Sequence, residues 1–106
     1  MERVNMGLDL VMFEHNNKII GIVEIDYSLH ESIFQSNNNW KSYNYLKKIS
    51  NYYLTDIVLE RTEIKKLIED LMNIKIFIPK NFHSSLEELV KILKNNEIEK
   101  IHIGGD

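Results

Sequence analysis

Residues 7–27, GLDLVMFEHNNKIIGIVEIDY, decide the fold of this chain. Two runs rich in Val, Ile, Leu, Met and Phe, residues 8–14 and 18–26, flank the dipeptide Asn16-Asn17. Asparagine tolerates the left-handed backbone of a tight turn, so the pattern predicts a β-hairpin with a two-residue loop. A loop of this length also fixes which residues of the two strands face each other.

The predicted register gives the hairpin one apolar face and one mixed face. The apolar face, which we expect to be core, pairs Leu8 with Ile25, Leu10 with Val23 and Met12 with Gly21. The mixed face carries apolar side chains near the turn, at Val11, Phe13, Ile20 and Ile22. At its open end Asp9 falls opposite Glu24, with Asp26 next along the strand. Like charges that face each other oppose strand pairing. A hairpin with these residues therefore either buries enough apolar surface elsewhere to tolerate the repulsion, or has a function for negative charge at this end.

Helices and two further strands are predicted after the hairpin. Hydrophobic periodicity and capping residues indicate helices at about 29–35, 40–53, 56–72 and 84–94, and short strands at 74–78 and 98–103. A strand, a helix and a strand in this order can pair in parallel through a right-handed crossover. We therefore predict an α+β fold, in which the N-terminal hairpin and a C-terminal β-α-β unit form a mixed four-stranded sheet with helices mainly on one face.

Size and composition favour one small domain that spans residues 1–106. The chain has no cysteine and a net charge of −3, and its acidic residues concentrate in residues 1–31, with six acidic and two basic side chains. This balance argues against direct binding to nucleic acid, whose affinity comes from neutralised phosphates. No apolar run is long enough for a membrane span, and residues 1–5 lack the features of a signal peptide, so we expect a cytoplasmic protein without membrane contact.

No motif in the sequence names a reaction. The four histidines never occur at metal-ligand spacing, and the four glycines form no phosphate-binding loop. The nucleophile elbow Gly-x-Ser-x-Gly is also absent. We therefore predict no catalytic residues, no metal and no cofactor.

The carboxylates of Asp9, Glu24 and Asp26 allow three interpretations. They form a solvated acidic edge, a docking patch for a basic partner, or a Mg²⁺ or acid–base site. The apolar residues on the same face favour docking if no helix covers them, since an apolar patch with an acidic rim is typical of protein-binding surfaces. We add Glu31 to the predicted rim, and Tyr45, expected to point away from its helix's apolar stripe, as an interface anchor.

In size, acidity and lack of catalytic motifs, the chain resembles the immunity proteins of contact-dependent growth inhibition and other bacterial polymorphic toxin systems. The resemblance implies a non-enzymatic inhibitor that covers the working surface of a cognate toxin. Toxin nucleases are basic because they bind phosphates, so an acidic inhibitor gains steered association. Asp9, Glu24, Asp26, Glu31 and Tyr45 are the residues predicted to bind this partner.

Two alternatives stay open at this stage. One is a small enzyme or ligand-binding domain that uses His30 with Glu31 or Asp26 as acid–base groups. The other is a homodimer formed through the second face of the hairpin or through an edge strand.

Overall fold

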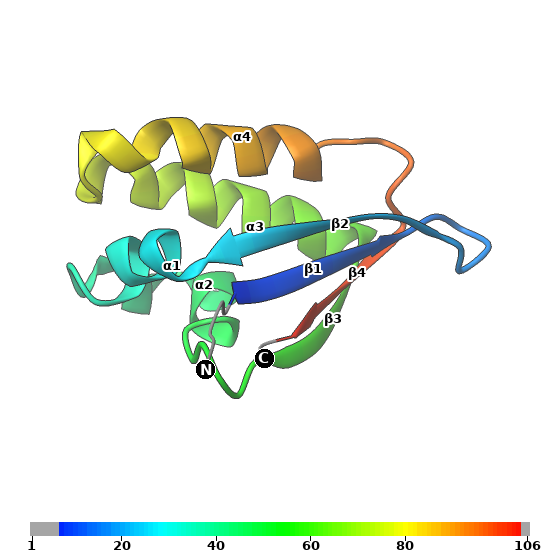
Figure 1. Cartoon of the computed structure of the whole chain (residues 1–106), viewed down its shortest axis with the longest axis horizontal. Coiled ribbons are helices and arrows are strands. Elements are labelled where there is room, and N and C mark those ends of the chain that lie inside the picture. The colour runs from blue at the N-terminus through cyan, green and yellow to red at the C-terminus, as the bar shows by residue number, and fades with distance from the viewer. Residues whose placement is uncertain (1–6, 105–106) are drawn as a thin grey trace, which may run out of the picture.

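The computed structural model describes residues 7–104, which form one four-stranded sheet and several helices (Figure 1). The strands are β1 (Gly7–Phe13), β2 (Ile19–Asp26), β3 (Asp56–Glu60) and β4 (Lys100–Gly104). Their order in the sheet is β2-β1-β4-β3, and every neighbouring pair is antiparallel. The α+β class and the four strands are thus confirmed, whereas the predicted mixed sheet with a C-terminal β-α-β unit is wrong. Residues 1–6, where the sequence predicts no signal peptide, lie outside the described part.

Four α-helices and three 3-10 turns connect and cover the strands. The α-helices are α1 (Tyr27–Phe34), α2 (Asn44–Lys48), α3 (Arg61–Ile74) and α4 (His83–Leu93). The 3-10 turns are η1 (Asn39–Ser42), η2 (Lys75–Phe77) and η3 (Lys80–Phe82). The predicted long helix from residue 40 to 53 is thus replaced by η1 and the short α2. No helix among residues 7–104 is long and apolar enough to cross a bilayer.

The hairpin keeps the predicted register through two irregularities that cancel. Its loop has three residues, because the Glu14 N–H donates to the Lys18 carbonyl and Asn17, with φ of 62°, occupies the left-handed region. This loop shifts the pairing by one residue, so Phe13 faces Ile19. A β-bulge between this pair and the Met12–Gly21 pair shifts the register back. From Met12 toward the start of β1, the facing pairs therefore match the prediction.

Gly21 lies where the bulge brings the two strands close together. A Cβ at this position would meet the Cε of Met12 at 2.9 Å, closer than van der Waals contact allows. The absence of a side chain at Gly21 therefore leaves space for Met12 to pack inside the sheet. A glycine inside a strand is typical of such a close-packing position.

The strand assignments after the hairpin are corrected at two places. Residues 56–60 form β3 instead of the start of a helix, and α3 begins at Arg61, where Glu60 and Glu63 form a capping box. Residues 74–78 are the end of α3 and η2 instead of a strand. Ile74 belongs to the buried stripe of α3, which includes Ile64, Leu67, Ile68 and Leu71.

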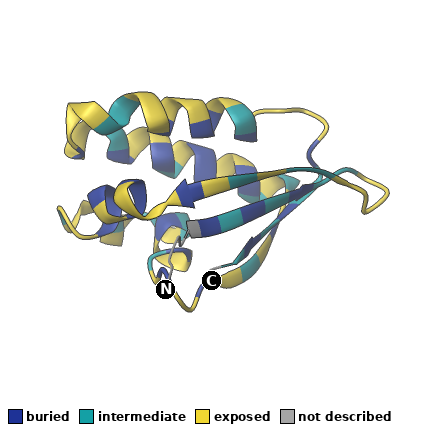
Figure 2. Ribbon diagram, viewed as in Figure 1, coloured by how far each residue is buried: buried dark blue, intermediate teal, exposed yellow. Residues whose placement is uncertain are grey.

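The helices cover one face of the sheet and leave the other uncovered by any described helix (Figure 1). Burial alternates along the strands, as Figure 2 shows. The inward side chains are fully or nearly fully buried against the helices; they include Leu8, Leu10, Ile25, Leu59, Ile101 and Ile103. Their burial supplies the hydrophobic stabilisation of the sheet, and the expectation of helices mainly on one face is confirmed.

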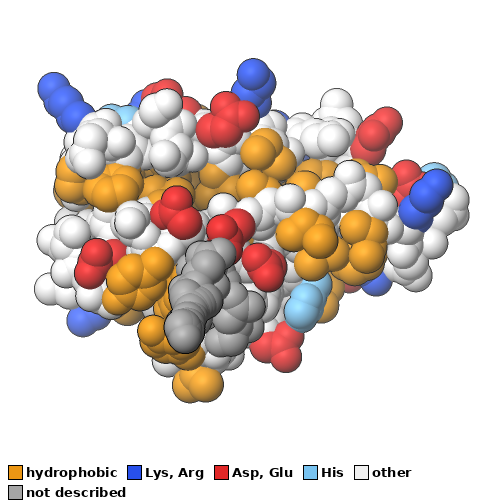
Figure 3. Space-filling model, viewed as in Figure 1, with side chains coloured by type: hydrophobic (Ala, Val, Ile, Leu, Met, Phe, Trp, Pro, Cys, Tyr) orange, Lys and Arg blue, Asp and Glu red, His pale blue; other side chains and the backbone are white. Residues whose placement is uncertain are grey.

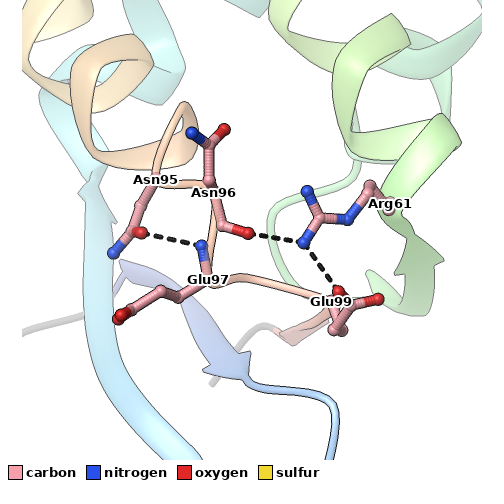
Figure 4. Close-up of polar contacts among 5 residues, drawn as sticks. All are labelled: Arg61, Asn95, Asn96, Glu97 and Glu99. Carbon is pink, nitrogen blue, oxygen red and sulfur yellow. Dashed lines mark hydrogen bonds and ion pairs between the residues drawn. The ribbon is translucent and has the colours of Figure 1, made fainter.

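Arg61 fixes the loop that brings the chain from α4 back into the centre of the sheet. Its Nη2 donates to the carbonyl of Asn96 at 2.5 Å and to Glu99 Oε2 at 2.6 Å, and within the loop the Glu97 N–H donates to Asn95 Oδ1 (Figure 4). The Glu99 N–H in turn donates to the carbonyl of Phe13. These contacts connect the first turn of α3 to the entry of β4, beside β1.

Candidate protein-binding face

The side of the sheet that no described helix covers, which we call the open face, consists of three rows of residues that run across all four strands. The acidic row is Glu24, Asp9, Gly104 and Asp56; the apolar row is Ile22, Val11, His102 and Val58; and the turn-side row is Ile19, Phe13, Lys100 and Glu60. Each row follows directly from the cross-strand pairing, because facing residues point to the same side of a sheet. The open face therefore combines residues that are up to 95 positions apart in the sequence.

The acidic row places three carboxylates side by side with no cation among its members. Asp9 lies directly opposite Glu24, as predicted, and Gly104 separates Asp9 from Asp56 on the far strand. The Asp9–Glu24 juxtaposition opposes pairing of β1 and β2. Of their inward neighbours, Leu8, Leu10 and Ile25 are completely or nearly completely buried and Val23 is partly buried, so core packing tolerates the repulsion.

The apolar row exposes large side chains next to these carboxylates. Ile22 and Val58 keep 63% and 51% of their surface accessible, and Ile19 in the next row keeps 55%. Figure 3 shows hydrophobic and acidic side chains next to each other on the part of the molecule that it displays. Contiguous apolar surface with a polar rim is typical of interaction sites.

Two contacts organise the basic groups of the open face. His102 Nε2 lies 2.6 Å from Asp56 Oδ1, and the Nζ of Lys100 lies 5.3 Å from the ring centroid of Phe13. The imidazole thus joins the acidic row to the apolar row, while Lys100 covers an aromatic ring at the turn side. Negative charge is therefore concentrated at one end of the open face.

The sequence missed half of the open face and misplaced one residue of it. Asp56, Val58 and His102 lie on strands whose pairing was not predicted. The short apolar run Ile57-Val58-Leu59, with two β-branched residues between Asp56 and Glu60, is the signal that would have identified β3. Ile20, expected on the mixed face, is the extra residue of the bulge and packs partly against the core, so Ile19 faces Phe13 instead.

Asp26 has a structural role besides its negative charge. Its Oδ1 accepts the Leu29 N–H at 2.9 Å, so Asp26 is the N-cap of α1. Ser28 and Glu31 have the spacing of a capping box, but Asp26 is the cap and the helix begins at Tyr27. Replacement of an Asp N-cap by a residue without an acceptor costs about 1 kcal/mol, so charge reversal at Asp26 would affect stability as well as charge.

The other two predicted partner-binding residues lie away from the rows of the open face. Glu31 is exposed on α1. Tyr45 is half-buried on α2, where its N–H donates to Asp70 Oδ2 at 2.9 Å and its side chain lines a cavity of about 780 Å³ between α2 and α3. Lys48 lies over the Tyr45 ring, with Nζ 5.5 Å from the centroid. The structure thus brings Asp9 and Glu24 together, with Asp26 at the end of the same strand, but not Glu31 or Tyr45 with them.

His30 lies inside the protein instead of in an accessible acid–base pair. Only 2% of its surface is accessible, its Nε2 lies 3.0 Å from the carbonyl of Ile49, and its ring packs against Phe34 and Tyr52. Because a carbonyl only accepts, Nε2 carries the proton, and Nδ1 has no partner within the described chain. Burial lowers the pKa of His30 below 6.5, although the Ile49 carbonyl opposes this effect. The pairing of His30 with Glu31 or Asp26 is not formed.

Metal binding finds no support in the geometry of the described residues. Within residues 7–104 no three His, Asp or Glu side chains are grouped closely enough to hold an ion. What the open face offers chemically is therefore contact: apolar area, negative charge and one imidazole.

Comparison of the chain with protein-family models, with curated proteins and with solved structures gave no match in any of the three.

Charge reversal at Glu24 should stabilise the protein. Glu24→Lys replaces a like-charge pair by an opposite-charge pair with Asp9, so the free energy of unfolding should rise by about 0.5–1 kcal/mol in urea denaturation at low salt. Glu97→Lys, the same change in an exposed loop, is the control and should stay within about 0.5 kcal/mol of the parent. Equal effects of the two variants would show that Asp9 and Glu24 do not repel each other.

Acidification should destabilise the protein through His30. Below pH 6.5 the unfolded chain takes up a proton at His30 that the folded chain does not, so stability is complete above this pH and falls as pH decreases, by at most about 1.4 kcal/mol per unit. His30→Gln keeps an N–H donor for the Ile49 carbonyl and should flatten the decline between pH 7 and 5. His15→Gln, in the exposed loop, should not; an unchanged slope in His30→Gln would contradict the assignment.

Proposed function

We propose that this chain is a non-enzymatic, cytoplasmic bacterial protein that binds and inhibits a basic partner protein through the open face. The observation that carries the proposal is the acidic row directly beside the exposed apolar row, on a side of the sheet that no described helix covers. Apolar area supplies the nonspecific driving force for association, and the carboxylates select a positively charged partner.

The partner that fits this surface best is a toxin of a polymorphic or contact-dependent inhibition system, with the chain as its immunity protein. A toxin that acts on nucleic acid carries a cationic working surface, because it must bind phosphates. A row of three carboxylates complements such a surface, and long-range attraction speeds the encounter. Coverage of the cationic surface would exclude the nucleic acid, so inhibition needs no catalytic residue on the inhibitor.

Hydrophobic and acidic side chains contribute differently to this interaction. Ile19 and Ile22 on β2 and Val58 on β3 provide exposed apolar contact area, and its desolvation on binding would make truncations costly. Asp9, Glu24 and Asp56 lie toward one end, where charge changes mainly alter the association rate. The predicted salt dependence is therefore a decline of the association rate with ionic strength, with a smaller change in dissociation.

The proposal predicts that a toxin domain is encoded beside this gene in its native genome, and the direct test uses that domain. The double variant Asp9→Lys, Glu24→Lys should bind this domain roughly 100-fold or more weakly in surface plasmon resonance, mainly through slower association, and should fail to protect cells that express the toxin. Asp26 is left unchanged in this design, because its reversal would uncap α1.

The matched control carries the same change of charge on the helical side. Glu69→Lys, Glu97→Lys alters two exposed carboxylates outside the open face and should keep affinity within about threefold and protection complete. Equal loss in both double variants would mean that net charge, not the open face, determines binding. Full affinity and protection in the Asp9, Glu24 variant would remove the open face from the interface.

A further inference from the structure

β2 forms one edge of the sheet and leaves its outer backbone without a strand partner. It pairs with β1 on one side, and on the other side no strand lies next to it within residues 7–104. With eight residues it is the longest of the four described strands. An edge of this kind is a template for an added strand, because its N–H and C=O groups can pair with an incoming chain.

A groove lies beside the C-terminal half of this edge, between β2 and α4. Its volume is about 400 Å³, and its apolar lining comes from Val23, Leu29, Leu89 and Ile92. In Figure 3 hydrophobic side chains form a band between α4 and the sheet, with acidic side chains on both sides. A strand added beside β2 would place every second side chain toward this band.

The rim of the groove is acidic. Glu24 and Asp26 from β2 and Glu88 from α4 line it, together with the hydroxyl groups of Ser84 and Ser85. None of the three carboxylates has an ion-pair partner among the described residues. Lys or Arg side chains of an incoming segment could therefore form ion pairs with carboxylates on both walls of the groove, which are the strand β2 and the helix α4.

We propose that an extended basic segment of the partner protein adds to β2 as a fifth strand, with its apolar side chains in the β2–α4 groove and its cationic side chains at Glu24, Asp26 and Glu88. The inference rests on the proposed function and adds the mode of recognition. It also makes the groove continuous with the open face, since Glu24 belongs to both. A second copy of this chain fits less well, because it would bring the same carboxylates to the contact.

The test is a titration of the isotope-labelled full chain followed by two-dimensional NMR. The probe is a synthetic peptide of alternating lysine and valine, capped at both ends and as long as β2. Amide shifts should change in β2 and at Ser84, Ser85 and Glu88 of α4, and hydrogen exchange of β2 amides should slow. A version of the peptide with methylated backbone nitrogens should not bind, because it cannot pair with the edge.

Variants then separate the groove from the open face. Glu88→Lys, which lies on the groove wall only, should weaken the peptide roughly tenfold, whereas Asp56→Lys, which lies on the open face only, should leave its affinity within about twofold. Binding with shifts confined to Val11, His102 and Val58, equal binding of the methylated peptide, or no binding would overturn the inference. None of these results affects the proposed function, which depends on the Asp9 and Glu24 variant and the whole toxin domain.

If the amide chemical shifts of β2 changed with protein concentration in the absence of peptide, a second copy of the chain would occupy the edge. That result would also overturn the inference, since the occupant would then be the chain itself.

Discussion

The pairing register of the β1–β2 hairpin is the constraint on which the rest of the structure depends. Side chains alternate strictly across a strand, so a shift of one residue would send Leu8 and Leu10 into solvent and Asp9 into the core. The three-residue loop introduces such a shift, and the bulge between the Phe13–Ile19 and Met12–Gly21 pairs removes it. Because β1 also pairs with β4, and β4 with β3, the same register determines which residues of all four strands reach the open face.

The two sides of the sheet consequently have different roles. The inner side supplies the core with the helices, and its burial is sufficient to tolerate facing carboxylates outside. The outer side carries no described helix, and its acidic row continues around Glu24 and Asp26 into the groove beside α4. One partner can thus contact a flat apolar area and an open strand edge at the same time. Surfaces of this kind suit a protein whose activity is to cover another protein.

Much of the hairpin could be predicted from sequence, because its signals are local. Alternation from Leu8 to Met12 and the asparagines of the loop predict the two strands and the turn between them. The loop has three residues instead of the expected two, and the predicted pairing holds because the bulge cancels the extra residue. The bulge at Ile20 was not part of the predicted pairing, which assumed a two-residue loop. Asp26 and Ser28 both offer an N-cap for α1, and only the path of β2 decides between them.

The second half of the sheet was not predicted correctly, because helical and strand patterns overlap in this part of the sequence. Ile57 and the apolar residues from Ile64 onward lie at spacings that fit one long helix, so the short apolar run at residues 57–59 was assigned to that helix. Ile74, Ile76 and Ile78 alternate like a strand, yet Ile74 completes the buried stripe of α3 and Ile76 remains exposed. As a result Asp56, Val58 and His102, which complete the open face, could not be placed next to Asp9 and Val11. Long-range pairing, not local propensity, positions them.

The accessibility of the two sides of the sheet can be measured directly with a soluble paramagnetic relaxation agent and methyl-labelled protein. If the open face is uncovered, the methyl signals of Ile22 and Val58 should broaden strongly, while those of Ile101 and Ile103, on the inner side of β4, should stay sharp. Protection of Ile22 and Val58 to the same degree as Ile101 would show that the face is covered, and would contradict its proposed role as the binding surface.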